Sequence, residues 1–179
     1  MVFLQQGRHA EAEPLYIRAQ AILEKALGPN HPDVALILNN LASLYCEQER
    51  YAEAEPLLKR ALAIWAQALG PDHPHAAAGM NNLASVYCDQ KRYAEAESLY
   101  ARALAILENS LGLEHPDVAI SLDGLALTFR VHGHYNDAKP FLLRALAIRQ
   151  QALGSEHPLT KATREALETL ATKNSAAIS

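Results

Sequence analysis

Histidine and cysteine are the residues in this sequence best suited to chemistry. His73 and His75 flank a proline, and His132 and His134 flank a glycine. Imidazole is a common metal ligand, but neither pair is accompanied by a cysteine or a carboxylate at a recognised ligand spacing. The sequence also has no serine in a nucleophile motif and no glycine-rich loop that would hold a phosphate. We therefore predict no metal site, no other cofactor and no enzymatic activity.

Two Asn-Asn pairs offer binding chemistry instead of catalysis. They are Asn39-Asn40 and Asn81-Asn82, and they stand 42 residues apart. A carboxamide both donates and accepts hydrogen bonds, so these side chains can bind a peptide unit or stabilise a contact between helices.

The composition of the 179-residue chain argues against several classes of function. Half of the residues are hydrophobic and only 6% are aromatic, which favours closely packed helices. The net charge of −4 is unfavourable for nucleic acid, which usually binds a basic surface. No apolar run approaches the roughly 18 residues that span a bilayer, and Met1–Gln6 lacks the features of a signal peptide. Because two cysteines fit a reducing environment, we predict a cytoplasmic protein that binds neither nucleic acid nor membrane.

A repeat of 42 residues organises the chain. Each repeat begins with His-Pro, and several further columns keep the same spacing. The histidines are His31, His73, His115 and His157, and other columns are Tyr51, Tyr93 and Tyr135, Ala54, Ala96 and Ala138, Arg60, Arg102 and Arg144, and Gly28, Gly70, Gly112 and Gly154. Such self-similarity is typical of helical repeat proteins, in which each unit buries its apolar face against the next.

Each repeat is predicted to form two helices, which we call first-type and second-type. The first-type helix starts at the proline, which lacks an N–H and therefore suits the first helical position. Its apolar residues recur at helical spacing, and the alanines expected at the closest helix contacts are Ala42, Ala84 and Ala126. The second-type helix extends from about Tyr51 to Leu69, and a left-handed cap is expected at Gly70.

The repeats form one continuous array over residues 1–172. We expect a partial repeat at 1–28, full repeats at 31–70, 73–112 and 115–154, and a terminal capping helix at 157–172. Residues 173–179 are expected to form a disordered tail. Val2–Arg8 aligns with the end of a first-type helix whose start is absent, so we interpret the sequence as a fragment of a longer array or of a multidomain protein.

Two segments carry a resemblance to a known family. Asn-Asn-Leu-Ala-Ser-Leu-Tyr at 39–45 and Tyr-Ala-Glu-Ala-Glu at 51–55 resemble the tetratricopeptide repeat, and the 42-residue spacing resembles its kinesin light chain subtype. The resemblance implies an all-α fold, a right-handed superhelical solenoid of antiparallel helix pairs. It also implies a protein–protein interaction scaffold, whose first-type helices line a concave groove that binds an extended peptide or partner segment.

The resemblance further implies that first-type residues not used for packing face this groove. These residues are Leu36, Asn39, Asn40, Ser43, Glu47, Ala78, Asn81, Asn82, Ser85, Asp89, Ile120, Asp123, Leu127 and Arg130. Among them, Asn40 and Asn82 match the asparagines with which family members bind peptide backbone. We expect this peptide contact, and a contact between helices is the alternative. Three of them are acidic and only Arg130 is basic, so we expect a neutral or mildly basic ligand, with one carboxylate accepted beside Arg130. The cationic clamp of chaperone-binding members and the basic groove associated with kinesin light chain cargo peptides are both missing.

Other notable residues are interpreted as structural. Trp65 aligns with Leu23, Leu107 and Arg149, and a column that accepts arginine predicts a half-exposed position. We expect a role of Trp65 in local packing, and a contact on the outer face is the alternative. The two cysteines occupy equivalent positions in successive repeats. Neighbouring helices lie about 8–10 Å apart, whereas a disulfide needs Cα atoms within roughly 7 Å, so we expect no bridge.

Self-association, as a structural module of a larger protein, is the alternative function. The helix near 9–27 lacks most of the first-type helix that would cover it. Leu15, Ala19 and Ile22 are therefore expected to be partly exposed, and a weak homodimer through this N-terminal end would cover them. The charged terminal helix is expected to be better solvated, like a cap.

Overall fold

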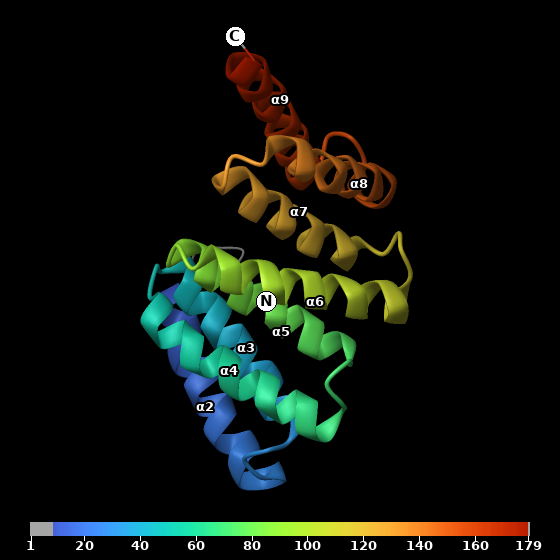
Figure 1. Ribbon diagram of the computed structural model, residues 1–179. Coiled ribbons are helices and arrows are strands. Elements are labelled where there is room, and N and C mark those ends of the chain that lie inside the picture. Colours follow the sequence, from blue (N-terminus) through green and yellow to red (C-terminus); the bar gives the residue numbers. More distant parts are fainter. Residues whose placement is uncertain (1–8, 179) are drawn as a thin grey trace. The chain divides into compact units, whose positions relative to one another are not determined.

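The computed structural model describes residues 9–178, and every regular element in that range is an α-helix. The helices follow one another through short turns (Figure 1). They are α2 (His9–Leu27), α3 (Pro32–Glu47), α4 (Tyr51–Ala68), α5 (Pro74–Asp89), α6 (Tyr93–Leu111), α7 (Pro116–Val131), α8 (Tyr135–Leu153) and α9 (Pro158–Ile178). The predicted fragment of a first-type helix at Val2–Arg8 lies outside the described residues.

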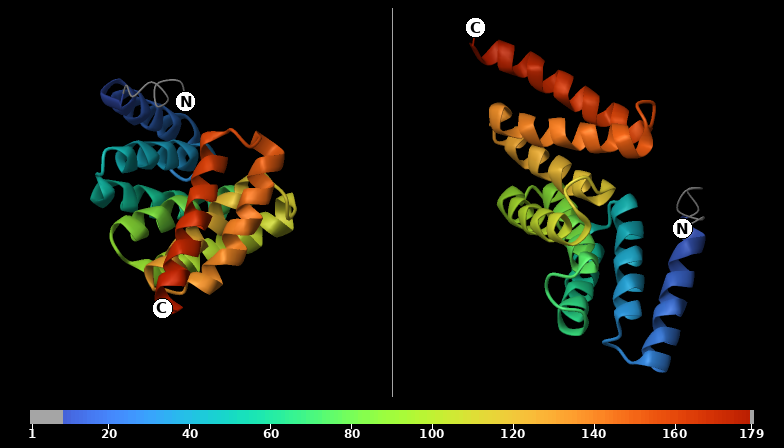
Figure 2. Two further views of the ribbon diagram at one scale, coloured as in Figure 1. Left: turned by 90° about the horizontal axis from the view of Figure 1, so that it is seen from above. Right: turned by 90° about the vertical axis from the view of Figure 1, so that its right-hand side faces the viewer.

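The helices gather into two compact units. The N-terminal unit, Met1–Lys91, contains α2 to α5, and the C-terminal unit, Arg92–Ser179, contains α6 to α9. In the first, α3 packs against α2 and α4, and α5 packs against α4 and touches α3; in the second, α7 lies between α6 and α8, and α9 packs on α8 (Figures 1 and 2). This arrangement confirms the predicted all-α class of repeated helix pairs.

Within the described residues, the helices are too short or too polar to cross a membrane.

Histidine explains why each first-type helix begins at His-Pro. The Nδ1 atoms of His31, His73, His115 and His157 each accept a hydrogen bond from the N–H two residues further on, at 3.2 Å. The first N–H groups of a helix have no partner inside it, and a side-chain acceptor at the N-cap satisfies one of them. The imidazole therefore takes the place that serine or aspartate usually occupies, while the proline that follows needs no partner.

The turn between the two helices of a repeat contains a residue with positive φ. The values are 59° at Glu49, 62° at Lys91 and 78° at Gly133, which are equivalent positions. At two of these turns the next N–H reaches back to the carbonyl five residues earlier, from Arg50 to Tyr45 at 2.8 Å and from His134 to Phe129 at 2.9 Å. This bond is the long one of a Schellman cap, which ends a helix with one left-handed residue.

The second-type helices end differently from the prediction. Gly112 has φ 93° and ψ 160°, and Gly154 has φ 85° and ψ 163°. The positive φ was expected, but the ψ is extended and not left-handed helical. This region is open essentially to glycine alone, which gives a stronger reason for the glycine column than the left-handed cap that the sequence predicted.

Alanine forms the closest contacts between the helices. Ala42, Ala84 and Ala126 have no exposed surface, as predicted, and neither do Ala54 and Ala138 of the second-type helices. In the C-terminal unit, Ala126 and Ala138 share a core cluster with Leu142 and Leu170, which brings α7, α8 and α9 together. A methyl group at each of these positions allows the helix axes to approach.

Helix α9 extends beyond the end that the repeat pattern predicts. The repeat predicts an end near Thr172, whereas α9 continues to Ile178. Its last residues include two alanines and no glycine or proline. Nothing in them breaks a helix, and alanine has the highest helix propensity of all residues.

We expect Glu49→Gly to raise the free energy of unfolding by about 0.5–1 kcal/mol. A side chain at positive φ costs roughly 1–2 kcal/mol, which exceeds the roughly 0.5–1 kcal/mol of conformational entropy that a glycine loses. Gly133 at the equivalent turn shows that the fold accepts glycine there. Urea denaturation followed by circular dichroism measures the change, with Glu49→Ala as the control that keeps the unfavourable φ. Equal stability of the glycine and alanine variants would contradict strain at this turn.

Candidate functional site

The predicted groove residues of the N-terminal unit lie on α3 and α5, but they are not all accessible. Leu36 and Glu47 of α3 are exposed, and so are Ala78, Ser85 and Asp89 of α5. Asn40, Ser43 and Asn82 are half-buried. Asn39 and Asn81 are buried, with 9% and 5% of their surface exposed. These two asparagines are therefore a correction to the prediction, because they point from the candidate surface into the packed interior.

A hydrogen bond between asparagines joins α3 to α5. The Nδ2 atom of Asn82 donates to Oδ1 of Asn39 at 2.9 Å. The backbone carbonyl of Asn39 also accepts the Ser43 hydroxyl at 3.0 Å. Asn39 and Asn82 thus take the role that the sequence offered as the alternative, a contact between helices. The Asn40 side chain has no hydrogen-bond partner among the residues that the structure describes.

Acidic residues lie at the carboxyl ends of these two helices. Asp89 is exposed as a whole residue, but partial desolvation of its carboxyl raises its pKa above the usual value, while a hydrogen bond from Tyr51 opposes the shift and the charge of Glu49 adds to it. Burial raises the pKa of the Cys46 thiol to about 11, and the neighbouring charges of Asp89 and Glu47 add to the effect. The thiol is therefore protonated at neutral pH and is a poor nucleophile.

Neither the cysteines nor the histidines form a larger constellation. Cys46 and Cys88 are not disulfide-bonded. Rings of His73 and His75 lie with centroids 5.0 Å apart, and those of His132 and His134 lie 6.4 Å apart. In the part of the chain that the structure describes, no three histidine, cysteine or acidic side chains gather as metal ligands would.

In the C-terminal unit, the predicted groove residues lie on α7, and two of them are apolar and two are charged. Ile120 and Leu127 are exposed, Arg130 is half-buried, and exposed Val131 lies beside them. Asp123 does not act as a free acidic group, because its Oδ2 pairs with Arg149 of α8. The sequence prediction of three acidic groove residues is corrected to two, both of which belong to the N-terminal unit.

The Asp123–Arg149 pair is largely buried. Arg149 is 7% exposed, and its guanidinium also donates to the Thr163 hydroxyl of α9, so that one side chain connects α7, α8 and α9. Burial raises the pKa of Asp123 above its usual value, and Arg149 opposes the shift. A buried pair of this kind adds little stability overall, but removal of one partner leaves a costly unpaired charge.

Trp65 occupies the same column as Arg149, and the predicted half-exposure of that column is wrong. Trp65 and Leu107 are each 1% exposed. Gly79 provides the space for the indole, because a Cβ at Gly79 would lie 2.8 Å from the Trp65 ring. The expected packing role of Trp65 is confirmed, and Arg149 enters the same buried position only because Asp123 and Thr163 satisfy it.

Gly124 stands where α3 and α5 have Asn40 and Asn82. The Tyr100 ring of α6 fills the space that a Cβ at Gly124 would need. The carboxamide of the other two repeats is therefore lost from α7 for a packing reason. The amide chemistry predicted for the candidate surface is confined to the N-terminal unit.

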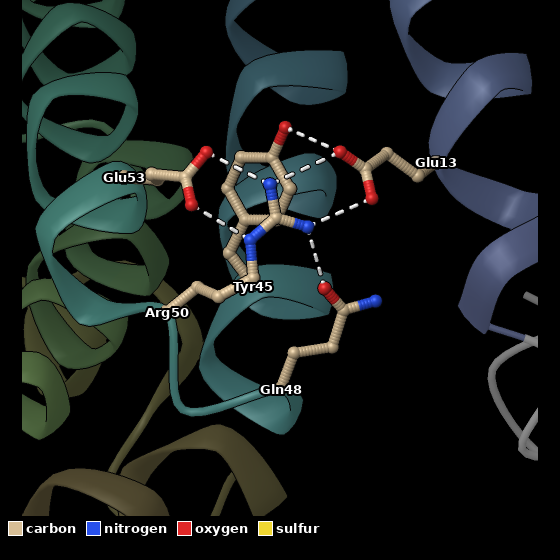
Figure 3. A network of polar contacts seen from close by, with 5 residues as sticks. All are labelled: Glu13, Tyr45, Gln48, Arg50 and Glu53. Carbon is tan, nitrogen blue, oxygen red and sulfur yellow. Dashed lines mark hydrogen bonds and ion pairs between the residues drawn. The ribbon is translucent and has the colours of Figure 1, made fainter.

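The sequence analysis missed a cluster around Arg50 (Figure 3). Its guanidinium lies 4.0 Å from the centre of the Tyr45 ring and pairs with Glu13 of α2 at 2.8 Å and Glu53 of α4 at 2.7 Å. Gln48 accepts a further hydrogen bond at 2.7 Å. The Arg50 hydrogen bond holds the pKa of Glu13 below its usual value. A repeated glutamate at 13, 55 and 97 and a repeated arginine at 50 and 92 were the available signal.

A second arginine column also joins successive repeats. Arg60 pairs with Glu24 at 2.8 Å and donates to the Pro29 carbonyl at 3.1 Å. Arg144 makes the equivalent contacts with Glu108 and with the Leu113 carbonyl. The sequence analysis did not assign these arginines a partner, whereas the structure shows that they attach α4 and α8 to the loop that follows the previous second-type helix.

The sequence matches the family model for the tetratricopeptide repeat. The matched residues are 1–54, 33–87 and 75–151, which together cover well over half of the chain. No curated protein sequence matches it.

Solved structures with similar repeats resemble the chain along almost its whole length. A putative kinesin light chain from Podospora anserina with nearly identical TPR-like repeats is 30% identical, with a TM-score of 0.76, over 97% of this chain and 82% of that one. BtubC (BKLC) from P. vanneervenii is 27% identical, with a TM-score of 0.82, over 97% and 69%. The apo form of RapI, at 18% identity and a TM-score of 0.81 over 98% and 61%, shares the fold alone.

Asp123 and Arg149 can each be replaced by the residue that other repeats hold at that position. We expect Asp123→Asn or Arg149→Leu alone to lower the free energy of unfolding by about 3 kcal/mol, because each leaves a buried charge without its partner. The double variant should recover most of this loss. Urea denaturation of the three variants gives the coupling free energy, and strictly additive losses would show that the two side chains do not stabilise each other.

Proposed function

The chain belongs to the tetratricopeptide repeat family, in its kinesin light chain-like form, and we propose that it is a scaffold that holds a partner protein by an extended segment. Scaffolds of this family generally mediate protein–protein interactions. The proposed binding surface is the outward face of α3 and α5 in the N-terminal unit.

The Asn40 side chain carries this proposal. It is half-buried on α3 and has no partner among the described residues, so its amide and its oxygen remain for a peptide unit. Asn82, the equivalent residue of α5, is oriented by its bond to Asn39 and keeps its oxygen for the same purpose. The Asn40 amide is not among the buried polar atoms that lack a partner, so it stays accessible to a ligand, and a bound backbone would replace its contact with water by direct hydrogen bonds.

Spacing and charge define the ligand. Packed helices lie about 10 Å apart, and an extended chain advances about 3.3 Å per residue, so roughly every third residue of a ligand meets a new helix. Ser43 and Ser85 provide further hydroxyl contacts, whereas Glu47 and Asp89 at one edge disfavour acidic segments. We therefore propose a neutral or mildly basic extended segment as the ligand.

The same reasoning favours a binding role over catalysis. The raised pKa of Cys46 and the internal pairing of Asp123 remove two groups from acid, base or nucleophilic work. We propose a scaffold without a catalytic function of its own and, because the two cysteines are not disulfide-bonded, a cytoplasmic setting.

A displayed library of random dodecapeptides, selected on the whole chain, tests the proposed function. We expect neutral or basic peptides whose affinity falls by about 1–3 kcal/mol in Asn40→Ala. Asn109→Ala, an exposed asparagine on α6, is the matched control and should leave binding unchanged. Glu47→Gln with Asp89→Asn should remove the preference for basic peptides. A library in which every selected peptide is strongly acidic, or in which Asn40→Ala weakens none of the selected peptides, would refute the proposal.

Self-association is the second candidate function, and the exposed face of α2 supports it. Ile22 is 55% exposed, whereas the equivalent Ile64, Ile106 and Ile148 are 3%, 5% and 4% exposed. Leu15 is also exposed and Ala19 is half-buried, in agreement with the sequence prediction. A second copy that covered this face would bury the surface that the other second-type helices bury within the chain.

Sedimentation equilibrium tests the second candidate. We expect a weak dimer of the wild type, because burial of the exposed parts of Ile22 and Leu15 would contribute roughly 3 kcal/mol per copy to the free energy of association. Ile22→Glu should abolish it, while Leu143→Glu, at an equally exposed site on α8, should not. A wild type that remains monomeric at high concentration would eliminate this candidate.

A further inference from the structure

The outward face of α7 carries a line of apolar side chains. Ile120, Leu127 and Val131 are 48%, 39% and 46% exposed. They are seven and four residues apart, so they lie on one side of the helix. At 1.5 Å per residue, the second is about 10 Å and the third about 16 Å along the axis from the first. We call these three residues the α7 stripe.

The fold does not require this line to be apolar. The equivalent residues are Leu36, Ser43 and Glu47 in α3, and Ala78, Ser85 and Asp89 in α5. Those helices pack in the same way and place polar residues at two of the three positions. Single exposed apolar residues are common, but a contiguous group of them marks an interaction surface. The α7 stripe therefore needs an explanation outside the packing of the chain.

The charge that is available beside the α7 stripe is positive. Asp123 and Arg130 are seven residues apart on the same flank of α7. The Asp123 carboxylate pairs with Arg149, whereas the Arg130 side chain has no hydrogen bond or ion pair with any residue that the structure describes. The flank consequently presents a cation and no available anion, which is the opposite of the acidic edge on α3 and α5.

From these contacts we infer that the α7 stripe binds an extended segment of a partner protein that carries apolar side chains and one carboxylate. The inference rests on the proposed scaffold function and adds a second, chemically distinct contact to it. Alternate side chains of an extended segment project on one side about every 6.6 Å. Two such residues match the separation of Leu127 and Val131, which is about 6 Å along the helix. An aspartate or glutamate beside them pairs with Arg130, which precedes Val131 by one position.

The substitutions at Leu127 and Val131 are taken from the equivalent positions of α3. Leu127→Ser with Val131→Glu places the α3 residues on α7, and Arg130→Gln removes the cation. Leu143→Ser is the matched control, because Leu143 is an equally exposed leucine of the same unit. Circular dichroism checks the fold of each variant. The probes are the dodecapeptides selected on the whole chain.

We expect a class of selected peptides with two apolar residues near one acidic residue. Their affinity should fall by tenfold or more in Leu127→Ser/Val131→Glu, since two apolar contacts are lost. In Arg130→Gln the affinity should fall several-fold, and the remaining affinity should no longer depend on salt concentration. Leu143→Ser and Asn40→Ala should leave these peptides unaffected.

Three other outcomes would overturn the inference. Peptides that are weakened by Asn40→Ala but not by the α7 variants would leave the proposed function standing and remove the α7 stripe from it. A library that yields no binding peptide would count against both. A dimer in sedimentation that Leu127→Ser/Val131→Glu dissolves would assign the stripe to a second copy of the chain.

Discussion

The distance between helices in this protein depends on alanine methyl groups. Ala42 and Ala54 in one repeat and Ala126 and Ala138 in another are completely buried where a first-type helix meets its second-type partner. Because interiors are packed as densely as crystals, a larger side chain there would push the helices apart. A constant spacing in each repeat leaves a fixed volume for all the other columns, so a change at one position must be compensated by its neighbours.

Three such compensations appear in the described residues. Trp65 occupies a column of leucines because Gly79 of the next helix leaves room for its ring. Tyr100 is accommodated in the same way by Gly124. Arg149 stands at the position equivalent to Trp65 in the last full repeat. Asp123 and Thr163 lie opposite it and bind its guanidinium. In the first two cases a glycine makes room for a large ring. In the third, a carboxylate and a hydroxyl satisfy the charge and the hydrogen bonds of the guanidinium.

These internal adjustments also determine the chemistry of the surface. Gly124 removes from α7 the carboxamide that α3 and α5 carry, and Arg149 neutralises the carboxylate that would have made α7 acidic. The N-terminal unit therefore presents amide, hydroxyl and acidic groups, whereas the C-terminal unit presents an apolar line beside an arginine. A scaffold of this family can in this way alter its recognition surface through residues that never contact a ligand.

The sequence by itself determined the 42-residue repeat, the starts of the first-type helices at His-Pro, the glycine positions and the fully buried alanines, because propensity, capping and helical periodicity are local properties. It could not determine which member of each Asn-Asn pair is buried, since positions one residue apart differ by about 100° around a helix and the partner helix decides between them. It also left open that Asp123 is paired and that the Trp65 column is buried. Those features depend on the side chains that a neighbouring helix brings into contact, such as Thr163 beside Arg149 and Gly79 beside Trp65. Only the tertiary structure decides them, because the energy of a buried charge or ring depends on partners that lie far away in the sequence.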